Sequence, residues 1–265
     1  MQDLGFNEEE LYSFIKIMNE YTGNDLSEKK SALAVKLRSF LKELNGISSF
    51  KEFLTRLQYD KKLKQETIDF VTVNETYFYR ELPQLKEALY YLKSLDKKVN
   101  VLCAPCSSGE EVYSLALLGV LNFSKENLNI VGIDINSKAI EKAKNAVYQG
   151  RSLHRLADSE KIRYFTKEGD FYKIKKEELC RCRFELCNVF DKKFLELGKF
   201  DAIFSRNMMI YFDYESRLKF AEVLYKIANN QCRLYIGNAD LMPDTEYWSK
   251  VFVPRGGTYY IKNDL

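Results

Sequence analysis

The stretch Val101-Leu-Cys-Ala-Pro-Cys-Ser-Ser-Gly-Glu-Glu111 decides the fold. It reads as a short buried strand, a tight turn and the start of a helix, a geometry that lets a ligand approach the backbone at the carboxyl end of a strand. Further apolar runs at 129–134, 200–204 and 233–237 read as strands, and helical patterns cover 84–95, 110–121 and 137–148, the last with Ser137 as its N-cap. Strands that alternate with helices predict an α/β fold with a parallel, doubly wound sheet.

The first 80 residues show a different pattern. Apolar residues recur at helical spacing through 11–18, and three more helices are predicted from about 27, over 50–57 with Ser49 as its cap, and over 61–70. In the second helix Ala34, Leu37 and Leu41 are expected to share the buried side. We therefore expect an N-terminal helical domain and linker over 1–80 and a second domain over 81–265. A small β-rich insertion is expected at about 161–187, where Gly169 and short Tyr/Phe/Ile runs interrupt the alternation of strands and helices.

Composition narrows the class of protein. The chain has 265 residues, of which 46% are hydrophobic and 30% charged, enough to bury a core without metals or disulfides. Its formal net charge of +3 does not support a generic nucleic-acid binder. The first ten residues are acidic and polar, which does not resemble a secretory signal, and no run of about 18 apolar residues occurs. A cytoplasmic monomer with reduced cysteines is expected, with no nucleic-acid partner and no membrane insertion.

Polar residues follow the predicted strands and indicate a ligand site. Asp134 ends the second strand, where an acid suits the hydroxyls of a ribose. Glu110 and Glu111 open a helix and would repel a phosphate there, so a cationic, phosphate-free nucleoside such as S-adenosylmethionine fits better. Arg206 and Asn207 follow a third strand at the same edge of the sheet. An ordinary strand–turn–helix with an acidic first turn remains the open alternative, because the helix dipole favours acids there.

Four blocks of the chain, in this order, resemble the signature blocks of the chemotaxis receptor methyltransferases, the CheR family. They are Asn74-Glu-Thr-Tyr-Phe-Tyr-Arg-Glu81, Ala104-Pro-Cys-Ser-Ser-Gly-Glu-Glu111, Gly132-Ile-Asp-Ile-Asn136 and Phe204-Ser-Arg-Asn-Met-Met-Ile-Tyr-Phe-Asp213. The resemblance covers essentially the whole chain. It implies a class I, Rossmann-like methyltransferase that uses S-adenosyl-L-methionine to esterify glutamates of chemoreceptors, and so tunes sensory adaptation.

The resemblance also implies roles for single residues. Arg80 and Tyr211 would shape the reacting centre. The cofactor would be bound by Asn74, Thr76, Arg80, Ala104, Pro105, Glu111, Asp134, Asn188, Val189, Arg206 and Asn207. The partner would be the acidic helical bundle of the receptors, and a basic second helix suits such a surface. Its basic residues include Lys29, Lys30, Lys36 and Arg38. A solvated helix face is the alternative for these cations.

One departure from the family concerns the predicted insertion. Its loop, about 167–178, looks shorter than in members whose insertion binds a peptide tail of the receptor. We therefore expect an enzyme that does not depend on a receptor tail. The reaction itself needs no general base, because a glutamate with a pKa near ~4.3 is already an anion at neutral pH. The single histidine, His154, is thus expected to lie outside the chemistry.

The sequence also allows other interpretations. Cys103 and Cys106 form a Cys-x-x-Cys that Cys180, Cys182 and Cys187 could complete as a zinc site, but the second spacing is irregular and no metal is expected. A thioredoxin-like role fits poorly with a pair that ends a strand in a cofactor-type turn. A methyltransferase with another protein or small-molecule acceptor, and a silent cofactor-binding or receptor-docking module, stay open. A base-flipping nucleic-acid enzyme lacks its Asn/Asp-Pro-Pro-Tyr motif here.

Overall fold

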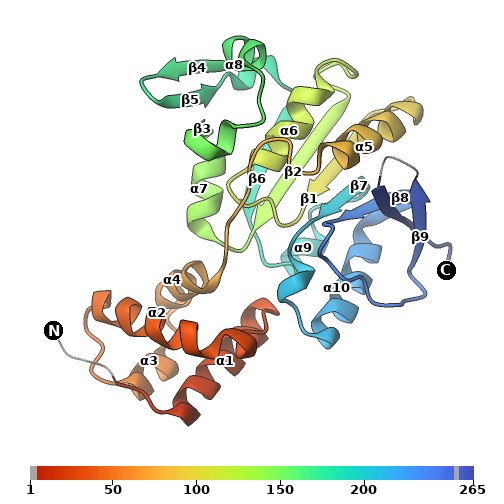
Figure 1. The fold of residues 1–265 in the computed structure, drawn as a ribbon. Helices are drawn as coiled ribbons and strands as arrows, with labels where there is room; N and C mark the ends of the chain where they lie inside the picture. The colour runs from red at the N-terminus through yellow and green to blue at the C-terminus, as the bar shows by residue number, and fades with distance from the viewer. Residues whose placement is uncertain (1–4, 254–256) are drawn as a thin grey trace. The chain divides into compact units, whose positions relative to one another are not determined.

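The computed structural model describes residues 5–253 and 257–265. The chain divides into two compact units (Figure 1). One unit holds the N-terminal residues up to Thr72 together with Tyr211–Ser216, and the other holds Val73–Ile210 and Arg217–Leu265. Each unit is described by itself.

The N-terminal unit is built from helices. Its four α-helices are α1 (Glu8–Thr22), α2 (Lys30–Glu43), α3 (Phe50–Arg56) and α4 (Lys61–Val71), and a 3₁₀ turn, η1 (Ser27–Lys29), precedes α2. Ser49 caps α3 as predicted, because its hydroxyl accepts a bond from the backbone N–H of Glu52 at 3.2 Å. The buried side of α2 differs by one position from the prediction. Leu33 is buried with Leu37 and Leu41, whereas Ala34 is only half-buried.

A distant segment, Tyr211–Ser216, clusters with these helices. The backbone N–H of Asp25 donates to the carbonyl of Tyr211 at 2.7 Å, and the amide of Asn19 donates to Asp213 at 2.9 Å. Lys29 places its ammonium 5.3 Å from the centre of the Tyr211 ring. The helical unit therefore holds the end of the fourth signature block.

The second unit contains a seven-stranded sheet in the order β6-β2-β1-β7-β8-β10-β9. Its strands are β1 (Val99–Cys103), β2 (Leu128–Asp134), β6 (Arg181–Leu186), β7 (Phe200–Ser205), β8 (Ala228–Ile236), β9 (Trp248–Val253) and β10 (Gly257–Lys262). All neighbouring pairs from β6 to β8 are parallel, while β10 runs antiparallel to β8 and to β9. Every residue of β7 is buried, as expected for a central strand that is covered on both faces.

Helices connect and cover these strands. They are α5 (Leu82–Ser94), α6 (Glu110–Gly119), α7 (Ser137–Asn145), α8 (Asp158–Tyr164), α9 (Lys192–Leu195) and α10 (Tyr214–Ile227). Asn136, and not the predicted Ser137, caps α7, because its side-chain oxygen accepts from the N–H of Ala139 at 2.9 Å. Both candidates are good capping residues, and the strand end at Asp134 fixes which of them holds the extended cap conformation.

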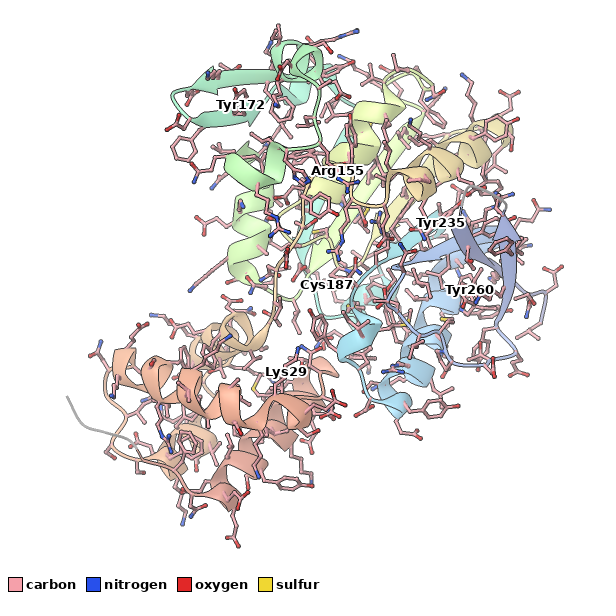
Figure 2. The ribbon with its side chains drawn as sticks, viewed as in Figure 1. Lys29, Arg155, Tyr172, Cys187, Tyr235 and Tyr260 are labelled. Atoms are coloured by element: carbon pink, nitrogen blue, oxygen red, sulfur yellow. The ribbon has the colours of Figure 1, made fainter. Side chains whose placement is uncertain are left out.

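A separate three-stranded antiparallel sheet has the order β3-β5-β4. Its strands are β3 (Val147–Tyr148), β4 (Phe165–Glu168) and β5 (Phe171–Ile174), and Tyr172 lies on it (Figure 2). The range predicted for the insertion, 161–187, also contains β6, which pairs with β2 of the main sheet. The third strand of the small sheet is β3, which lies before the predicted range in the sequence.

These elements confirm the fold class predicted from the sequence: a mostly parallel, Rossmann-like α/β sheet with an N-terminal helical region and a small antiparallel sheet. Among the described residues, no helix has the length and apolar content needed to cross a bilayer.

Candidate functional site

The carboxyl ends of four neighbouring strands, β6, β2, β1 and β7, meet at one edge of the main sheet. Backbone bonds continue past the strands and hold these ends together: Ala104 N–H donates to the Phe204 carbonyl at 2.8 Å, and Cys106 N–H donates to the Ile133 carbonyl at 2.7 Å. The strand order reverses between β1 and β7, and open α/β sheets bind ligands at such a reversal. This edge is therefore the candidate site.

Asp134 fixes the turn that follows β1. It is 5% exposed, and its two carboxylate oxygens accept the N–H groups of Ser107 and Asn136, each at 2.8 Å. Ser107 has a left-handed backbone, with φ at 48°, which costs energy for a residue other than glycine and is held here by the bond to Asp134. The predicted ribose-binding acid thus also shapes the loop beside it.

Arg206 is the centre of a buried charge cluster. Its side chain is 2% exposed, and its Nη1 lies 3.1 Å from Oε2 of Glu111, whose side chain is 12% exposed. Its Nε lies 3.6 Å from Oε2 of Glu81, and its Nη2 donates to the backbone carbonyl of Arg80 at 2.6 Å. One guanidinium therefore joins the end of β7, the start of α6 and the loop before α5. Glu81 was missed in the sequence, although it directly follows the predicted Arg80.

The cluster leaves polar atoms that a ligand could satisfy. Burial raises the pKa of the Glu111 carboxyl, and the charge of Arg206 opposes that rise. Within the described part of the chain, Oε1 of Glu111 and the hydroxyl of Ser107 are buried and have no hydrogen-bond partner. A buried polar atom without a partner costs about 1–3 kcal/mol. Ser107 lies in the turn between β1 and α6 and Glu111 in the first turn of α6, and the acidic side chain suits a ligand with donor groups and positive charge. The residues therefore fit S-adenosylmethionine.

Glu110, in contrast, turns away from this cluster. It is 1% exposed, and it accepts bonds from the hydroxyls of Ser108 at 2.6 Å and Ser152 at 2.8 Å. Of the two acids that open α6, only Glu111 contacts Arg206. The sequence argument, which used both acids to disfavour a phosphate, rests on Glu111 alone.

The segment that carries Arg80 is anchored by its neighbours. Phe78 and Tyr79 are buried, and the N–H of Tyr79 donates to the hydroxyl of Ser114 at 2.9 Å. Arg80 donates from Nη1 to the Glu75 carbonyl at 3.0 Å and stays half-buried. Its charge also lowers the pKa of the Glu111 carboxyl, although burial and Arg206 weigh more. Arg80 is therefore close to the cluster through both its carbonyl and its charge.

The remaining predicted cofactor residues divide into two groups. Asn188 and Val189 follow β6, where the N–H of Cys187 donates to the Asp134 carbonyl at 3.0 Å, so both belong to the same edge of the sheet. Asn74 and Thr76 lie in the irregular segment before α5, the first exposed and the second half-buried. The roles predicted for Asn74 and Thr76 stay predictions.

Asp240, which the sequence did not single out, organises the loop after β7. It is 6% exposed and accepts the N–H groups of Asn207, of Gly237 at 2.9 Å and of Ile210 at 3.1 Å. Asn207 has a left-handed backbone, with φ at 59°. The signal that would have found Asp240 is its place just after β8, at the same edge as Asp134 and Arg206.

Gly237 supports the same loop by having no side chain. A Cβ at this position would lie 2.8 Å from the backbone nitrogen of Asn207 and 2.9 Å from Oδ2 of Asp240. We expect Gly237→Ala to lower the free energy of unfolding by about 1–3 kcal/mol and to weaken cofactor binding. Thermal unfolding and calorimetric titration with S-adenosylhomocysteine would measure both. Gly5→Ala is the matched control, because a Cβ at Gly5 meets nothing within 4 Å. Equal stability of the two variants would contradict the prediction.

The predicted receptor-binding cations and Tyr211 belong to the helical unit. Lys30 pairs with Glu8 at 2.6 Å, and Arg38 lies 5.1 Å from the centre of the Phe6 ring. Lys29 contacts Tyr211 as described above, and Lys36 is exposed. Their roles toward a receptor stay predictions.

The six cysteines are free thiols, five of them buried. Across residues 5–253 and 257–265, no group of three or more His, Cys, Asp or Glu side chains is placed to hold a metal ion. Burial raises the pKa of Cys103 and of Cys106, which keeps both as neutral thiols in the core.

Comparison with known proteins gives a consistent result. A family model described as CheR methyltransferase, SAM binding domain, matches residues 74–256. A chemotaxis protein methyltransferase of Campylobacter jejuni (strain 81-176) is 60% identical over 257 residues, covering 97% of each chain. The chemotaxis protein methyltransferase of Borreliella burgdorferi is 30% identical and covers 90% of each chain. That of Escherichia coli K12 is 28% identical over 81% of this chain and 77% of its own.

Proposed function

Because the chain belongs to the CheR methyltransferase family, we propose that it methylates glutamate side-chain carboxylates of bacterial chemoreceptors. The cofactor is S-adenosyl-L-methionine, and the product is S-adenosyl-L-homocysteine. The observation that supports the site most directly is the Arg206–Glu111 pair at the sheet reversal, with Oε1 of Glu111 unpartnered beside it. We propose a cytoplasmic monomer whose partner is the helical bundle of the receptors.

The residues at the strand ends would hold the cofactor. Glu111 would accept bonds from its amino-acid end, and Asp134 would accept bonds from its ribose. Asn188 and Val189 would flank the adenine, while Arg206 keeps the carboxylate of Glu111 oriented. Ala104 and Pro105 would pass close to the ligand, and Asn74 and Thr76 would line its pocket.

The main task of the protein in this reaction is to position the acceptor carboxylate and the methyl donor. When bound, S-adenosylmethionine supplies a methyl group that is activated by the sulfonium charge. The accepting glutamate is an anion at neutral pH, so no general base is needed. The fork of a guanidinium matches a carboxylate, so Arg80 would orient the acceptor, and Tyr211 would shape the reacting centre. His154 is exposed and contacts the Arg151 carbonyl, which suits a role outside the chemistry.

The experiment is a methyl-transfer assay. The purified chain is incubated with labelled S-adenosylmethionine and membranes that contain chemoreceptors, with Arg80→Ala alongside. We expect base-labile label on receptor glutamates, and a loss of at least about 100-fold in Arg80→Ala, because positioning terms of this size are common in catalysis. Arg163→Ala is the control, an exposed arginine on α8 that should keep full activity.

Two outcomes would change the proposal. Cofactor binding without label on any receptor carboxylate would indicate another methyl acceptor or a silent docking module. Receptors that lack their C-terminal residues test whether methylation depends on a peptide tail of the receptor. We expect these shortened receptors to be methylated as well as the full-length ones. A loss of methylation that is confined to the shortened receptors would contradict the proposed independence from the tail.

A further inference from the structure

Two arginines and the single histidine of the chain lie near the ring of Tyr77. The guanidinium carbon of Arg80 is 5.9 Å from the centre of this ring, and that of Arg155 is 5.3 Å from it (Figure 2). The ring of His154 lies 4.9 Å away, centre to centre. Tyr77 and Arg80 are half-buried, whereas Arg155 and His154 are exposed. Because an aromatic face attracts cations, Tyr77 holds a second arginine beside the one proposed to orient the acceptor.

The turn that carries Arg155 is fixed at both ends. At its start, the N–H of Phe78 donates to the carbonyl of Ser152 at 3.0 Å. At its end, the carboxylate of Glu160 accepts the hydroxyl of Tyr79 at 2.5 Å. Arg155 therefore lies between two points at which its segment is bonded to the first signature block. A side chain on such a support is better placed for recognition than one on a free loop.

The guanidinium of Arg155 is accessible to an anion. No described carboxylate lies within 4.0 Å of it or of the Arg80 guanidinium, which donates to the neutral carbonyl of Glu75 at 3.0 Å. The carboxylate of Glu75 pairs with Arg151 at 3.2 Å, and both of these side chains are exposed. The acid nearest to Arg80 in this segment is thus balanced by a third arginine, which leaves the charges of Arg80 and Arg155 for a ligand.

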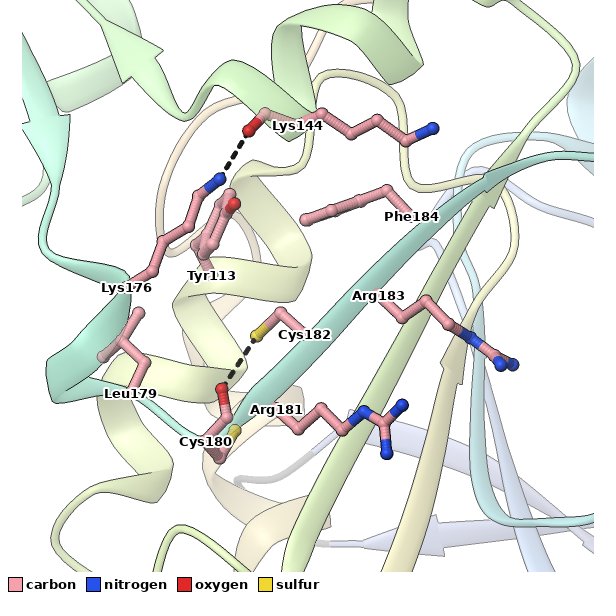
Figure 3. Close-up of a pocket in the computed structure, with 9 residues that line it drawn as sticks. All are labelled: Tyr113, Lys144, Lys176, Leu179, Cys180, Arg181, Cys182, Arg183 and Phe184. Carbon is pink, nitrogen blue, oxygen red and sulfur yellow. Dashed lines mark hydrogen bonds between the residues drawn. The ribbon is translucent and has the colours of Figure 1, made fainter.

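The basic rim of a cavity of about 500 Å³ beside β6 differs in this respect (Figure 3). The ammonium of Lys176 donates to the carbonyl of Lys144 at 2.5 Å, and Arg183 pairs with Glu185 at 3.1 Å. Cations that already have partners in the chain gain less from an added anion. The pair beside Tyr77 is therefore the better candidate for contact with an acidic partner.

The spacing of the two arginines suits an acidic helix. Both guanidinium groups are close to one ring centre, so their separation cannot exceed the sum of the two distances given above. An α-helix rises about 5.4 Å per turn, so two acids one turn apart on the same face have a comparable spacing. The fork of each guanidinium matches one carboxylate. One helix could therefore place two acids against the two arginines.

We propose that Arg155 determines specificity for the methyl acceptor by binding a second carboxylate on the helix whose glutamate Arg80 orients. The enzyme then prefers a glutamate that has another acid about one turn away on the same face of its helix. This inference rests on the proposed function, since it concerns the acceptor of that reaction.

The test compares two synthetic helical peptides, each titrated into the full chain at low salt with saturating S-adenosylhomocysteine. One peptide carries two glutamates four residues apart, on one face. The other has the same net charge but carries them two residues apart, on different faces. We expect the first to bind about threefold to fivefold more tightly, because an exposed ion pair is worth up to ~1 kcal/mol. The preference should fade as salt rises.

Three variants assign this preference to one residue. Arg155→Gln should bind both peptides equally, and Arg155→Lys should keep part of the preference because it keeps the charge. Arg163→Gln is the matched control and should behave like the wild type. Arg163 is also exposed and lies 5.1 Å from the centre of a tyrosine ring, that of Tyr164, but it belongs to α8. All three variants should unfold at the temperature of the wild type.

Equal binding of the two peptides by the wild type, or an undiminished preference in Arg155→Gln, would overturn the proposal. A loss of the preference in Arg163→Gln would also overturn it, because the effect would then be one of general charge. With receptors that the wild type labels, Arg155→Gln should raise KM by a similar factor and leave kcat unchanged. Peptide binding does not need methyl transfer, so the preference can be absent while receptors are labelled, and present where no receptor is.

Discussion

Arg206→Met is expected to lower the free energy of unfolding by about 3–5 kcal/mol and to abolish measurable binding of S-adenosylhomocysteine. The side chain of Arg206 is almost fully buried between Glu111 and Glu81. Methionine has a similar length but no charge, so the substitution leaves two carboxylates in the interior without their cation. Calorimetric unfolding and titration would measure the two effects separately.

Two further variants show whether the effect belongs to this site. Arg233 of β8 is a partly buried arginine, paired with Glu87 of α5, and Arg233→Met should cost stability but leave cofactor affinity unchanged. Adding Glu111→Gln to Arg206→Met should restore part of the lost stability, because it removes one unpaired charge, without restoring binding. If both arginine variants bound the cofactor like the wild type, the cluster would be purely structural.

Local patterns in the sequence were sufficient for part of this fold. The strand–turn–helix at 101–111 and the acid that ends β2 lie where the sequence predicts them, because burial on both faces and the start of a helix leave strong local signals. The cap of α7 and the upstream strand β3 were less visible. The cap depends on which of two similar neighbours, Asn136 or Ser137, the tertiary structure selects, and β3 is a two-residue strand defined by its pairing with β5.

The polar network of the site was only partly predictable. Single residues such as Glu111, Asp134 and Arg206 follow strands and could be named from position. Their partners come from far along the chain: Arg206 bonds to the carbonyl of Arg80, and Asp240 bonds to Asn207. Pairings of this kind depend on strand order, which no local pattern specifies. That is why Glu81 and Asp240 emerged only from the structure.

Asp240→Asn is the second variant with a large expected effect. The native carboxylate accepts three backbone N–H groups from both sides of the loop after β7, and an amide would turn an NH₂ group toward at least one of these donors. We expect a loss of about 2–3 kcal/mol in the free energy of unfolding and at least tenfold weaker cofactor binding, since the loop carries Arg206 and Asn207. Asp201→Asn is the control. Asp201 is equally buried but accepts from Asn100 at the opposite end of the sheet, so its loss should spare cofactor affinity.

The pH dependence of this variant provides an independent test. Burial raises the pKa of Asp240 above its ordinary value, although the three N–H donors oppose the rise. The folded chain therefore binds a proton more readily than the unfolded chain, and the contribution of this group to stability falls as pH rises through the folded pKa. Asparagine does not titrate. The stability of the wild type relative to Asp240→Asn should thus increase as pH is lowered from 7 toward the unfolded value near ~3.9. A difference that shrinks on acidification would mean that the N–H donors outweigh burial, and that the carboxylate is held in the loop as a favourable charge.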